Sequence, residues 1–269
     1  MNLYYFGSIS PGIRYTTSNV FKKAIRHKFN KHLFRSNVNI VRRRGKIVCR
    51  HRIGRHKRLY RIIDFWRNKI YKLGYVCSIE YDPNRNSSIA RITYSDKTQK
   101  YILAPNRVHV GAKIIAGFQV PIENGNSLPL WNIPLGTNVH NVELYPGSGG
   151  KLGRSAGMLI NLIAREQGFV TLRLPSGKLR LVSQMCWRTI GQVSNVTARN
   201  IKLGKRGRMF WLGRRSMVRG SVINPVDHPH GGGEGRRSIG HIHPCTPWGK
   251  PRLGRKTRHL KKYSNAFFV

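Results

Sequence analysis

Basic residues in this chain are concentrated in two long segments that flank a middle of more ordinary charge. The 269 residues carry 50 Lys and Arg against 9 Asp and Glu, a formal net charge of +41. Residues 1–72 hold 20 basic residues and one acidic residue, and residues 203–269 hold 15 basic and two acidic residues. Such charge repels itself in a compact state unless a polyanion neutralises it. We therefore expect both segments to order on nucleic acid, with adsorption to an anionic membrane surface as the alternative.

The composition restricts the compartment and the membrane topology. No apolar run approaches about 18 residues, so no membrane-spanning helix is expected. The cysteines are far apart and form no C-x-x-C pair, which favours free thiols over a disulfide framework: Cys49, Cys77, Cys186 and Cys245.

Residues 18–34 predict a basic amphipathic helix. A possible Ser18 cap precedes apolar residues at helical spacing, namely Phe21, Ala24, Ile25, Phe29 and Leu33. Because no acidic residue precedes Asp64, a mitochondrial transit peptide is an alternative interpretation of this segment.

The middle of the chain predicts β-structure. Short apolar or alternating runs separated by turn residues indicate an antiparallel meander at residues 76–81, 89–94 and 99–104, and further strands at 169–174 and 178–183. Residues 158–164 fit a helix by periodicity, but their length and neighbours favour a strand. A short helix is possible near residues 196–201, and loops are expected beyond residue 203. Two small all-β barrels or sandwiches fit these spacings.

The first basic segment, residues 42–69, mixes cations with planar side chains. Arginine can donate two hydrogen bonds to a phosphate and can stack on a base. The planar rings between the arginines and lysines are those of His51, His56, Tyr60, Phe65 and Trp66. The alternation in RLYRIIDF also predicts that Ile62, Ile63 and Phe65 pack against the barrel core.

Residues 224–235, NPVDHPHGGGEG, are unsuited to helix or sheet. Proline removes a backbone donor and glycine permits positive φ, so the segment is expected to stay extended unless something outside orders it. A zinc site is one interpretation of the nearby His228, His230, His241, His243 and Cys245, although their spacing lacks the usual paired ligands. General acid–base chemistry by Asp227 and Glu234 lacks a rigid support.

The segment GSGGKLGRSAG, residues 147–157, is rich in glycine but does not have the order of a phosphate-binding P-loop. Its backbone amides, together with Lys151 and Arg154, are expected to approach RNA phosphate.

Several motifs occur in the order found in one family. They are RHRIGRHKRLYRIIDF (50–65), IEYDPNR (79–85), YILAP (101–105), NIPLGTNVHNVEL (132–144), GRSAG (153–157), VRG followed by NPVDHPHGGGEG, and TPWGK (246–250). The chain resembles the large-ribosomal-subunit protein L-two family over nearly everything after Arg50. The resemblance implies a mainly β fold with a basic extension at 1–72, an OB-like barrel at 73–131, an SH3-like barrel at 132–202 and a Gly/Pro-rich extension at 203–269.

The resemblance also implies a non-catalytic role. We expect a structural constituent of the large subunit that supports assembly, subunit association and organisation of the peptidyl-transferase region; a zinc-dependent nucleic-acid enzyme is the alternative. The rRNA-binding residues carried over are Arg50, His51, Arg52, Arg55, His56, Lys57, Arg58, Lys151, Arg154, Arg219, Asn224, Asp227, His228, His230, Gly231, Gly232, Gly233, Arg236, Arg237, Trp248 and Lys250.

The expected partners are large-subunit rRNA, neighbouring ribosomal proteins and the small subunit at an intersubunit bridge. No cofactor of its own is expected, although magnesium associated with rRNA could lie near Asp227. Ile53-Gly54-Arg55 replaces the family's glycine triplet, and the segment before Arg42 does not match the usual arm. These departures favour a mitochondrial version, with a plastid or bacterial ribosome as the alternative.

Overall fold

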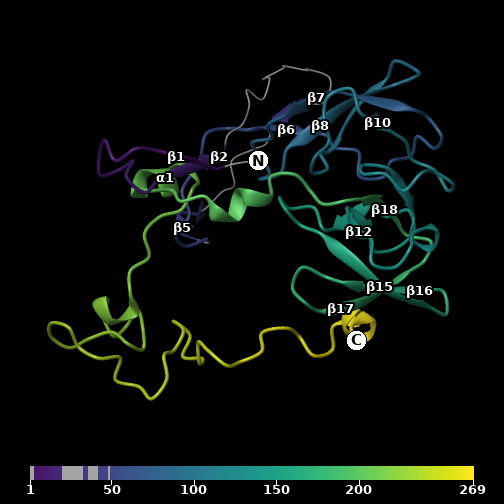
Figure 1. The fold of residues 1–269 in the computed structure, drawn as a ribbon. Helices are drawn as coiled ribbons and strands as arrows, with labels where there is room; N and C mark the ends of the chain where they lie inside the picture. Colours follow the sequence, from purple (N-terminus) through teal and green to yellow (C-terminus); the bar gives the residue numbers. More distant parts are fainter. Residues whose placement is uncertain (1–2, 20–32, 36–41, 48) are drawn as a thin grey trace. The chain divides into compact units, whose positions relative to one another are not determined.

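The computed structural model describes residues 3–19, 33–35, 42–47 and 49–269. The chain divides into two compact units (Figure 1). Unit 1 consists of residues 1–38, 56–208 and 266–269, and unit 2 consists of residues 39–55 and 209–265. In the described chain, unit 1 carries both large sheets, whereas unit 2 is mostly loops.

The first large sheet of unit 1 has four antiparallel strands in the order β10-β7-β8-β9. They are β10 (Lys113–Ile114), β7 (Gly74–Glu80), β8 (Ile89–Tyr94) and β9 (Gln99–Leu103). Side chains alternate between the two faces of a strand, and along β7 Val76 is buried while Tyr75 and Cys77 are exposed. The buried face forms a core cluster of Val76, Ala90, Ile92, Tyr94, Ile102, Ala104 and Ile114.

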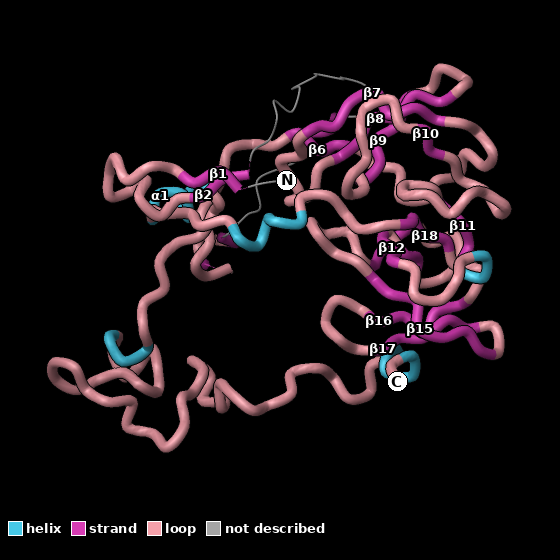
Figure 2. Tube along the Cα trace, viewed as in Figure 1, coloured by secondary structure: helices cyan, strands magenta, loops and turns pink. Residues whose placement is uncertain are grey.

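The second large sheet of unit 1 has six strands in the order β11-β18-β12-β15-β16-β17 (Figure 2). They are β11 (Ser127–Pro129), β18 (Trp187–Ile190), β12 (Asn138–His140), β15 (Ile160–Glu166), β16 (Phe169–Arg173) and β17 (Leu179–Ser183). A separate two-stranded ladder joins β13 (Val142–Glu143) to β14 (Gly150–Leu152).

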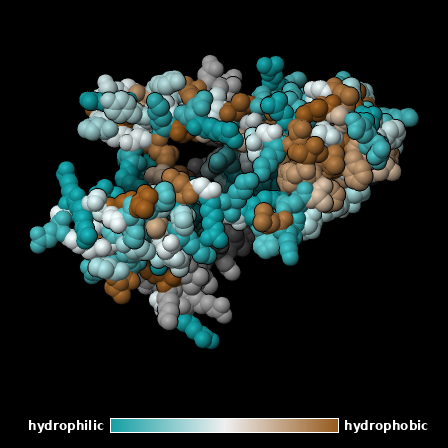
Figure 3. Space-filling model, turned by 90° about the horizontal axis from the view of Figure 1, so that it is seen from below, coloured by the Kyte–Doolittle hydropathy of each residue, from teal (hydrophilic) through white to brown (hydrophobic). Residues whose placement is uncertain are grey.

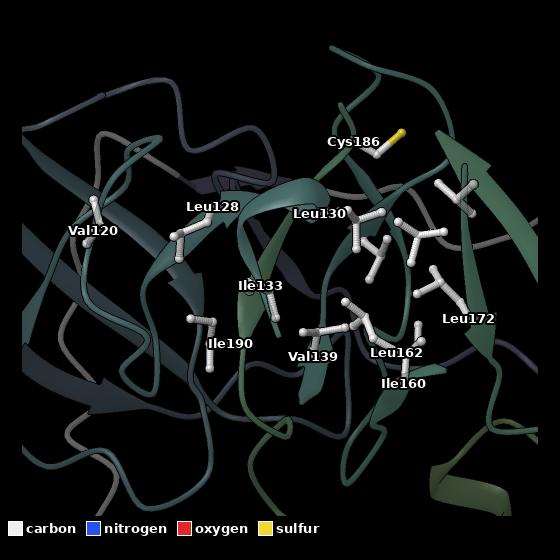
Figure 4. Packing of buried hydrophobic residues seen from close by; sticks show 13 residues of the cluster. Val120, Leu128, Leu130, Ile133, Val139, Ile160, Leu162, Leu172, Cys186 and Ile190 are labelled. Atoms are coloured by element: carbon white, nitrogen blue, oxygen red, sulfur yellow. The ribbon is translucent and has the colours of Figure 1, made fainter. Parts of the chain in front are cut away.

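The largest hydrophobic cluster of the described residues is formed by the second sheet and the segments next to it. Figure 4 shows its side chains gathered in one cluster, consisting of Val120, Leu128, Leu130, Ile133, Val139, Val142, Ile160, Leu162, Val170, Leu172, Val182, Cys186 and Ile190. The 3₁₀ helix η2 (Leu130–Asn132) places Leu130 in this core. Full burial of each large aliphatic side chain contributes roughly 1.5–3 kcal/mol. This cluster is therefore a main source of stability for the sheet.

Hydrogen bonds connect the segments that flank the two large sheets inside unit 1. The Ile115 N–H donates to Asn126 Oδ1 at 2.9 Å. The Ser194 N–H donates to Ala104 O at 3.0 Å, beside an antiparallel bridge between Pro105 and Val193. These hydrogen bonds hold the loops next to the two sheets in fixed positions.

Three small two-stranded antiparallel ladders precede the first large sheet in the described chain. They pair β1 (Leu3–Tyr5) with β2 (Thr17–Asn19), β3 (Leu33–Arg35) with β6 (Leu59–Arg61), and β4 (Arg42–Arg43) with β5 (Lys46–Ile47). The helix predicted at 18–34 is wrong at its ends, because Ser18 lies in β2 and Leu33 in β3. Its central part, residues 20–32, lies outside the described residues.

Beyond the second sheet the described chain forms only short helices joined by loops. They are η3 (Val196–Asn200), α1 (Arg206–Trp211), η4 (Gly220–Val222) and η5 (Tyr263–Phe267). The short helix predicted near 196–201 is confirmed as η3, and so is the prevalence of loops after residue 203.

The fold class predicted from the sequence is confirmed as mainly β, with an OB-like barrel followed by an SH3-like barrel. The predicted meander corresponds to β7, β8 and β9, and residues 158–164 contribute to strand β15 rather than to a helix. The predicted domain boundaries stay predictions. Among the described helices, none has the length and apolar character needed to cross a membrane.

Candidate nucleic-acid interface

A pocket of about 420 Å³ lies beside the first large sheet of unit 1. It is lined by β6, by the loop after β6, by the β7–β8 turn and by the loop between β14 and β15. The lining residues are Tyr60, Phe65, Asn84, Arg85, Asn86, Arg154 and Ser155. Two cations, two aromatic rings and two amides thus converge from segments distant in the sequence.

A buried aspartate organises the β7–β8 turn. Asp82 is fully buried; its Oδ1 accepts from the Asn84 N–H at 2.8 Å, and its Oδ2 lies 2.6 Å from Arg85 Nε. Arg58, from the first basic segment, donates from Nη1 to Pro83 O at 2.6 Å in the same turn. A carboxylate that is hydrogen-bonded and paired with a cation tolerates burial, so Asp82 can fix the direction of the Arg85 side chain.

Phe65 lies next to two guanidinium groups. The Arg85 guanidinium carbon is 5.6 Å from the centre of the Phe65 ring, and that of Arg154 is 4.6 Å from it. Arg85 also lies 6.0 Å from the Tyr60 ring. Within the described residues Arg154 forms no ion pair with a carboxylate, and it is exposed. A cation–π contact attracts each arginine to the ring but does not neutralise its charge.

The glycine-rich segment, residues 147–157, is hydrogen-bonded to Glu143 and to the backbone of Phe65, a residue of the pocket lining. The buried Glu143 carboxylate accepts the N–H groups of Gly147 at 3.2 Å, Gly149 at 2.8 Å and Trp187 at 3.0 Å. The Gly150 N–H donates to Phe65 O at 3.0 Å. The amides of Gly147, Gly149 and Gly150 thus donate inside the protein, and the expected approach of the rest of this segment to RNA phosphate stays a prediction.

Trp66 packs against the same glycine segment. Its Nε1 donates to Gly147 O at 3.3 Å. Gly149 has φ of +71°, and a Cβ added there would lie 3.0 Å from the Trp66 ring. Glycine is thus required both by the backbone conformation and by the close indole. This contact of Trp66 holds the backbone next to Phe65 in place.

The residues predicted in the first basic segment are divided between the two units. His56, Lys57 and Arg58 belong to unit 1, whereas Arg50, His51, Arg52 and Arg55 belong to unit 2. In unit 2 the Ile53 N–H donates to Gly213 O at 3.1 Å, and Arg52 forms a bridge with Arg214. The segment is therefore ordered partly by pairing with residues 213–215 rather than only by an outside partner.

The NPVDHPHGGGEG segment of unit 2 forms tight turns. The Asp227 N–H donates to Asn224 O at 3.0 Å, and the Gly231 N–H donates to His228 O at 2.9 Å. A Cβ on Gly231 would lie 2.4 Å from Asn224 O, so the turn requires glycine at this position. The expectation of an extended segment is thus wrong for these residues.

Three imidazoles cluster beside this turn. The ring centres of His228 and His230 are 4.8 Å apart, and those of His230 and His241 are 5.6 Å apart. His230 Nε2 accepts from the Cys245 N–H at 2.8 Å, and His241 Nε2 donates to Pro229 O at 3.2 Å. Partial burial and the two neighbouring histidines lower the pKa of His230. The partners of His230 and His241 in these hydrogen bonds are backbone groups of the protein. In the described chain, no group of three His, Cys, Asp or Glu side chains is arranged to hold a metal ion.

The TPWGK motif of unit 2 forms a hairpin. The Thr246 N–H donates to Lys250 O at 2.8 Å, and Arg252 N–H donates to Pro244 O at 2.9 Å. Trp248 is exposed, and the Arg50 guanidinium lies 6.0 Å from its ring. Other predicted residues in unit 2 are also exposed, namely Arg219, Asn224, Asp227, Gly233, Arg236, Arg237 and Lys250.

Arg85, the second cation of the pocket, was not predicted as a binding residue. The motif IEYDPNR (79–85) contains it without predicting a binding role, whereas the glycine-rich segment and the family resemblance both predict Lys151 and Arg154. The structure places Arg154 in the pocket lining, whereas Lys151 is exposed on β14. Of the apolar residues predicted to pack, Ile63 and Phe65 join a core cluster, but Ile62 is 41% exposed.

Figure 3 shows hydrophilic side chains over much of the displayed face, with hydrophobic groups between them. The two β-barrels, the net charge of +41 and the aromatic–arginine pocket are features typical of the class of RNA-binding β-barrel proteins. The family model for Ribosomal Proteins L2, RNA binding N-terminal domain, matches residues 21–116, and the model for the C-terminal domain matches residues 123–249. The chain therefore belongs to the ribosomal protein L2 family, whose members are structural rRNA-binding proteins of the large ribosomal subunit.

Proposed function

We propose that the pocket lined by Phe65, Arg85 and Arg154 binds large-subunit rRNA. The observation that carries this proposal is the position of Phe65 beside two arginines, one of which has no carboxylate partner in the described chain. A phosphate would neutralise Arg154, and an unpaired base would stack on the exposed planar groups.

The basic segments of unit 2 supply further residues for the proposed contact with rRNA. We propose that the predicted residues of unit 2, from Arg50 to Arg55 and from Arg219 to Lys250, bind rRNA backbone and bases. Few acidic residues neutralise this positive charge, since residues 203–269 contain only Asp227 and Glu234. Magnesium associated with rRNA is proposed near Asp227, whose exposed carboxylate suits a hydrated divalent cation.

We further propose that the protein supports subunit assembly, contributes to an intersubunit bridge and organises the peptidyl-transferase region without catalysing a reaction itself. The turns around His228 and His230 support a structural role for these residues, because their hydrogen bonds hold the loop together. The departures in the first basic segment support a mitochondrial ribosome, with plastid and bacterial ribosomes as alternatives.

The test is the affinity of the full chain for a large-subunit rRNA transcript. Arg154→Ala should weaken binding roughly ten- to hundredfold, because it removes a charge-assisted contact. The matched control is Arg173→Ala, which removes an exposed arginine on β16 outside the pocket. Equal losses in the two variants would show that only total charge matters and would reject the pocket as the site.

A further inference from the structure

The last four described residues, Ala266–Val269, belong to unit 1, although residues 209–265 before them belong to unit 2. Figure 1 shows the chain end, in yellow, beside strand β17. The chain therefore leaves unit 1 near residue 208 and returns to it at residue 266.

The returning residues lie on an open edge of the second large sheet. Among the described strands, β17 pairs on one side only, with β16. An edge strand presents unpaired backbone groups that accept another strand. Here the Val269 N–H donates to Leu179 O at 3.4 Å, and Phe268 forms an antiparallel bridge with Arg180.

Two aromatic side chains reinforce this backbone pairing. The Arg180 guanidinium carbon lies 5.3 Å from the Phe268 ring centre and 5.9 Å from that of Phe267. Lys178 Nζ lies 5.7 Å from the Phe268 ring. Both phenylalanines are half-buried. Each cation–π contact at an exposed site is weak, but several on one strand edge add to the main-chain pairing.

The N-terminal end of this basic segment, at Lys202, is also hydrogen-bonded to unit 1. The Thr17 N–H donates to Lys202 O at 3.0 Å, and the Lys202 N–H donates to Thr17 Oγ1 at 2.7 Å. The basic segment between Lys202 and Ala266 is thus attached to unit 1 at both ends.

We propose that residues 266–269, which run from the end of the 3₁₀ helix η5 into the pairing with β17, are a docking segment that closes the basic segment into a loop and thereby increases its affinity for rRNA. This inference rests on the proposed rRNA-binding function. A segment held at one end samples many positions and loses that freedom when it binds, whereas a closed loop has already lost part of it. The docking segment also covers part of the edge of β17 against pairing with other chains.

The test uses the full chain and a large-subunit rRNA transcript. The variant Phe267→Ala/Phe268→Ala removes both rings, and the control Leu253→Ala/Leu260→Ala removes two exposed apolar side chains of the same segment. Hydrogen exchange at Val269 reports docking, and the affinity for rRNA reports its consequence. We expect faster exchange and about tenfold weaker binding in the phenylalanine variant, with both properties unchanged in the control.

Three outcomes separate the inference from the proposed function. If the phenylalanine variant exchanges faster but binds rRNA as well as the parent, the docking segment has no role in binding and the inference is overturned. If exchange at Val269 is unchanged, the two rings do not hold the docking segment on β17, and the inference is equally overturned. If the parent chain itself does not bind rRNA, the proposed function fails first.

Discussion

The guanidinium carbon of Arg154 lies 4.6 Å from the centre of the Phe65 ring, although 88 positions separate the two residues along the chain. The Gly150 N–H donates to Phe65 O, so the glycine segment that precedes Arg154 is hydrogen-bonded to Phe65 itself. The position of the arginine therefore depends on the phenylalanine backbone as well as on its ring.

Replacing Phe65 should weaken rRNA binding through loss of stacking. We expect Phe65→Leu, which keeps apolar packing on Ile63, to lower affinity roughly five- to hundredfold, and Phe65→Tyr to retain most of it. Equilibrium binding to a large-subunit rRNA transcript measures the effect. If the leucine variant bound like the parent, aromatic stacking would have no part in recognition.

Binding should weaken steeply as salt increases, because each neutralised phosphate releases condensed counterions. For RNA we expect a slope of about −0.7 to −0.9 in log K against log salt for each phosphate contacted. Arg154→Ala should reduce the total slope by about one. A titration in potassium chloride gives both values, and affinity independent of salt would contradict the electrostatic basis of binding.

His140 should make unit 1 less stable in mild acid. Burial lowers the pKa of this histidine to about 4, and its Nδ1 hydrogen-bonds Gly191 O at 2.9 Å. The unfolded state, with an ordinary pKa near 6.5, takes up a proton first as the pH falls. Stability is therefore retained above about pH 6.5 and decreases toward pH 4, by about 3 kcal/mol in total.

Denaturant unfolding between pH 7 and pH 4 checks this prediction. His140→Asn keeps a donor for Gly191 O but cannot titrate, so its stability should change less over the same interval. An equally steep pH dependence in this variant would assign the effect to other groups.

The thiols of Cys49, Cys77 and Cys186 should differ in reactivity. Burial, and secondarily Glu143, raises the pKa of the Cys186 thiol to about 12, whereas Cys49 and Cys77 are exposed. Iodoacetamide at pH 8 should modify Cys49 and Cys77 in the native protein and leave Cys186 unmodified until denaturation. Mass spectrometry of the peptides reads out each site; rapid native labelling of Cys186 would contradict its burial.

The strands were predictable because their determinants are local. Alternation of apolar and polar residues in Val76–Glu80 and Ile89–Tyr94 gives the period of a sheet with one buried face. The same pattern could not establish which residues of RIIDF are buried. Ile63 packs with Tyr101, whereas Ile62 is exposed, and that choice depends on a parallel bridge between Ile63 and Tyr101.

The candidate site was predictable only in part. Motif order identified Arg154, but the role of Arg85 depends on Asp82 directing its side chain toward Phe65. The glycine amides were assigned to phosphate because their buried acceptor, Glu143, is apparent only once the fold is formed. Contacts between distant segments therefore account for most of what the sequence analysis missed.

The pairing of β11 with β18 has a consequence for synthesis on the ribosome. Leu128 lies opposite Arg188, so this edge of the sheet cannot form until about 60 further residues have emerged. At roughly 5–20 residues per second the delay is several seconds. During that time the apolar side chains of Leu128 and Leu130 have no completed core to enter and stay exposed on the nascent chain.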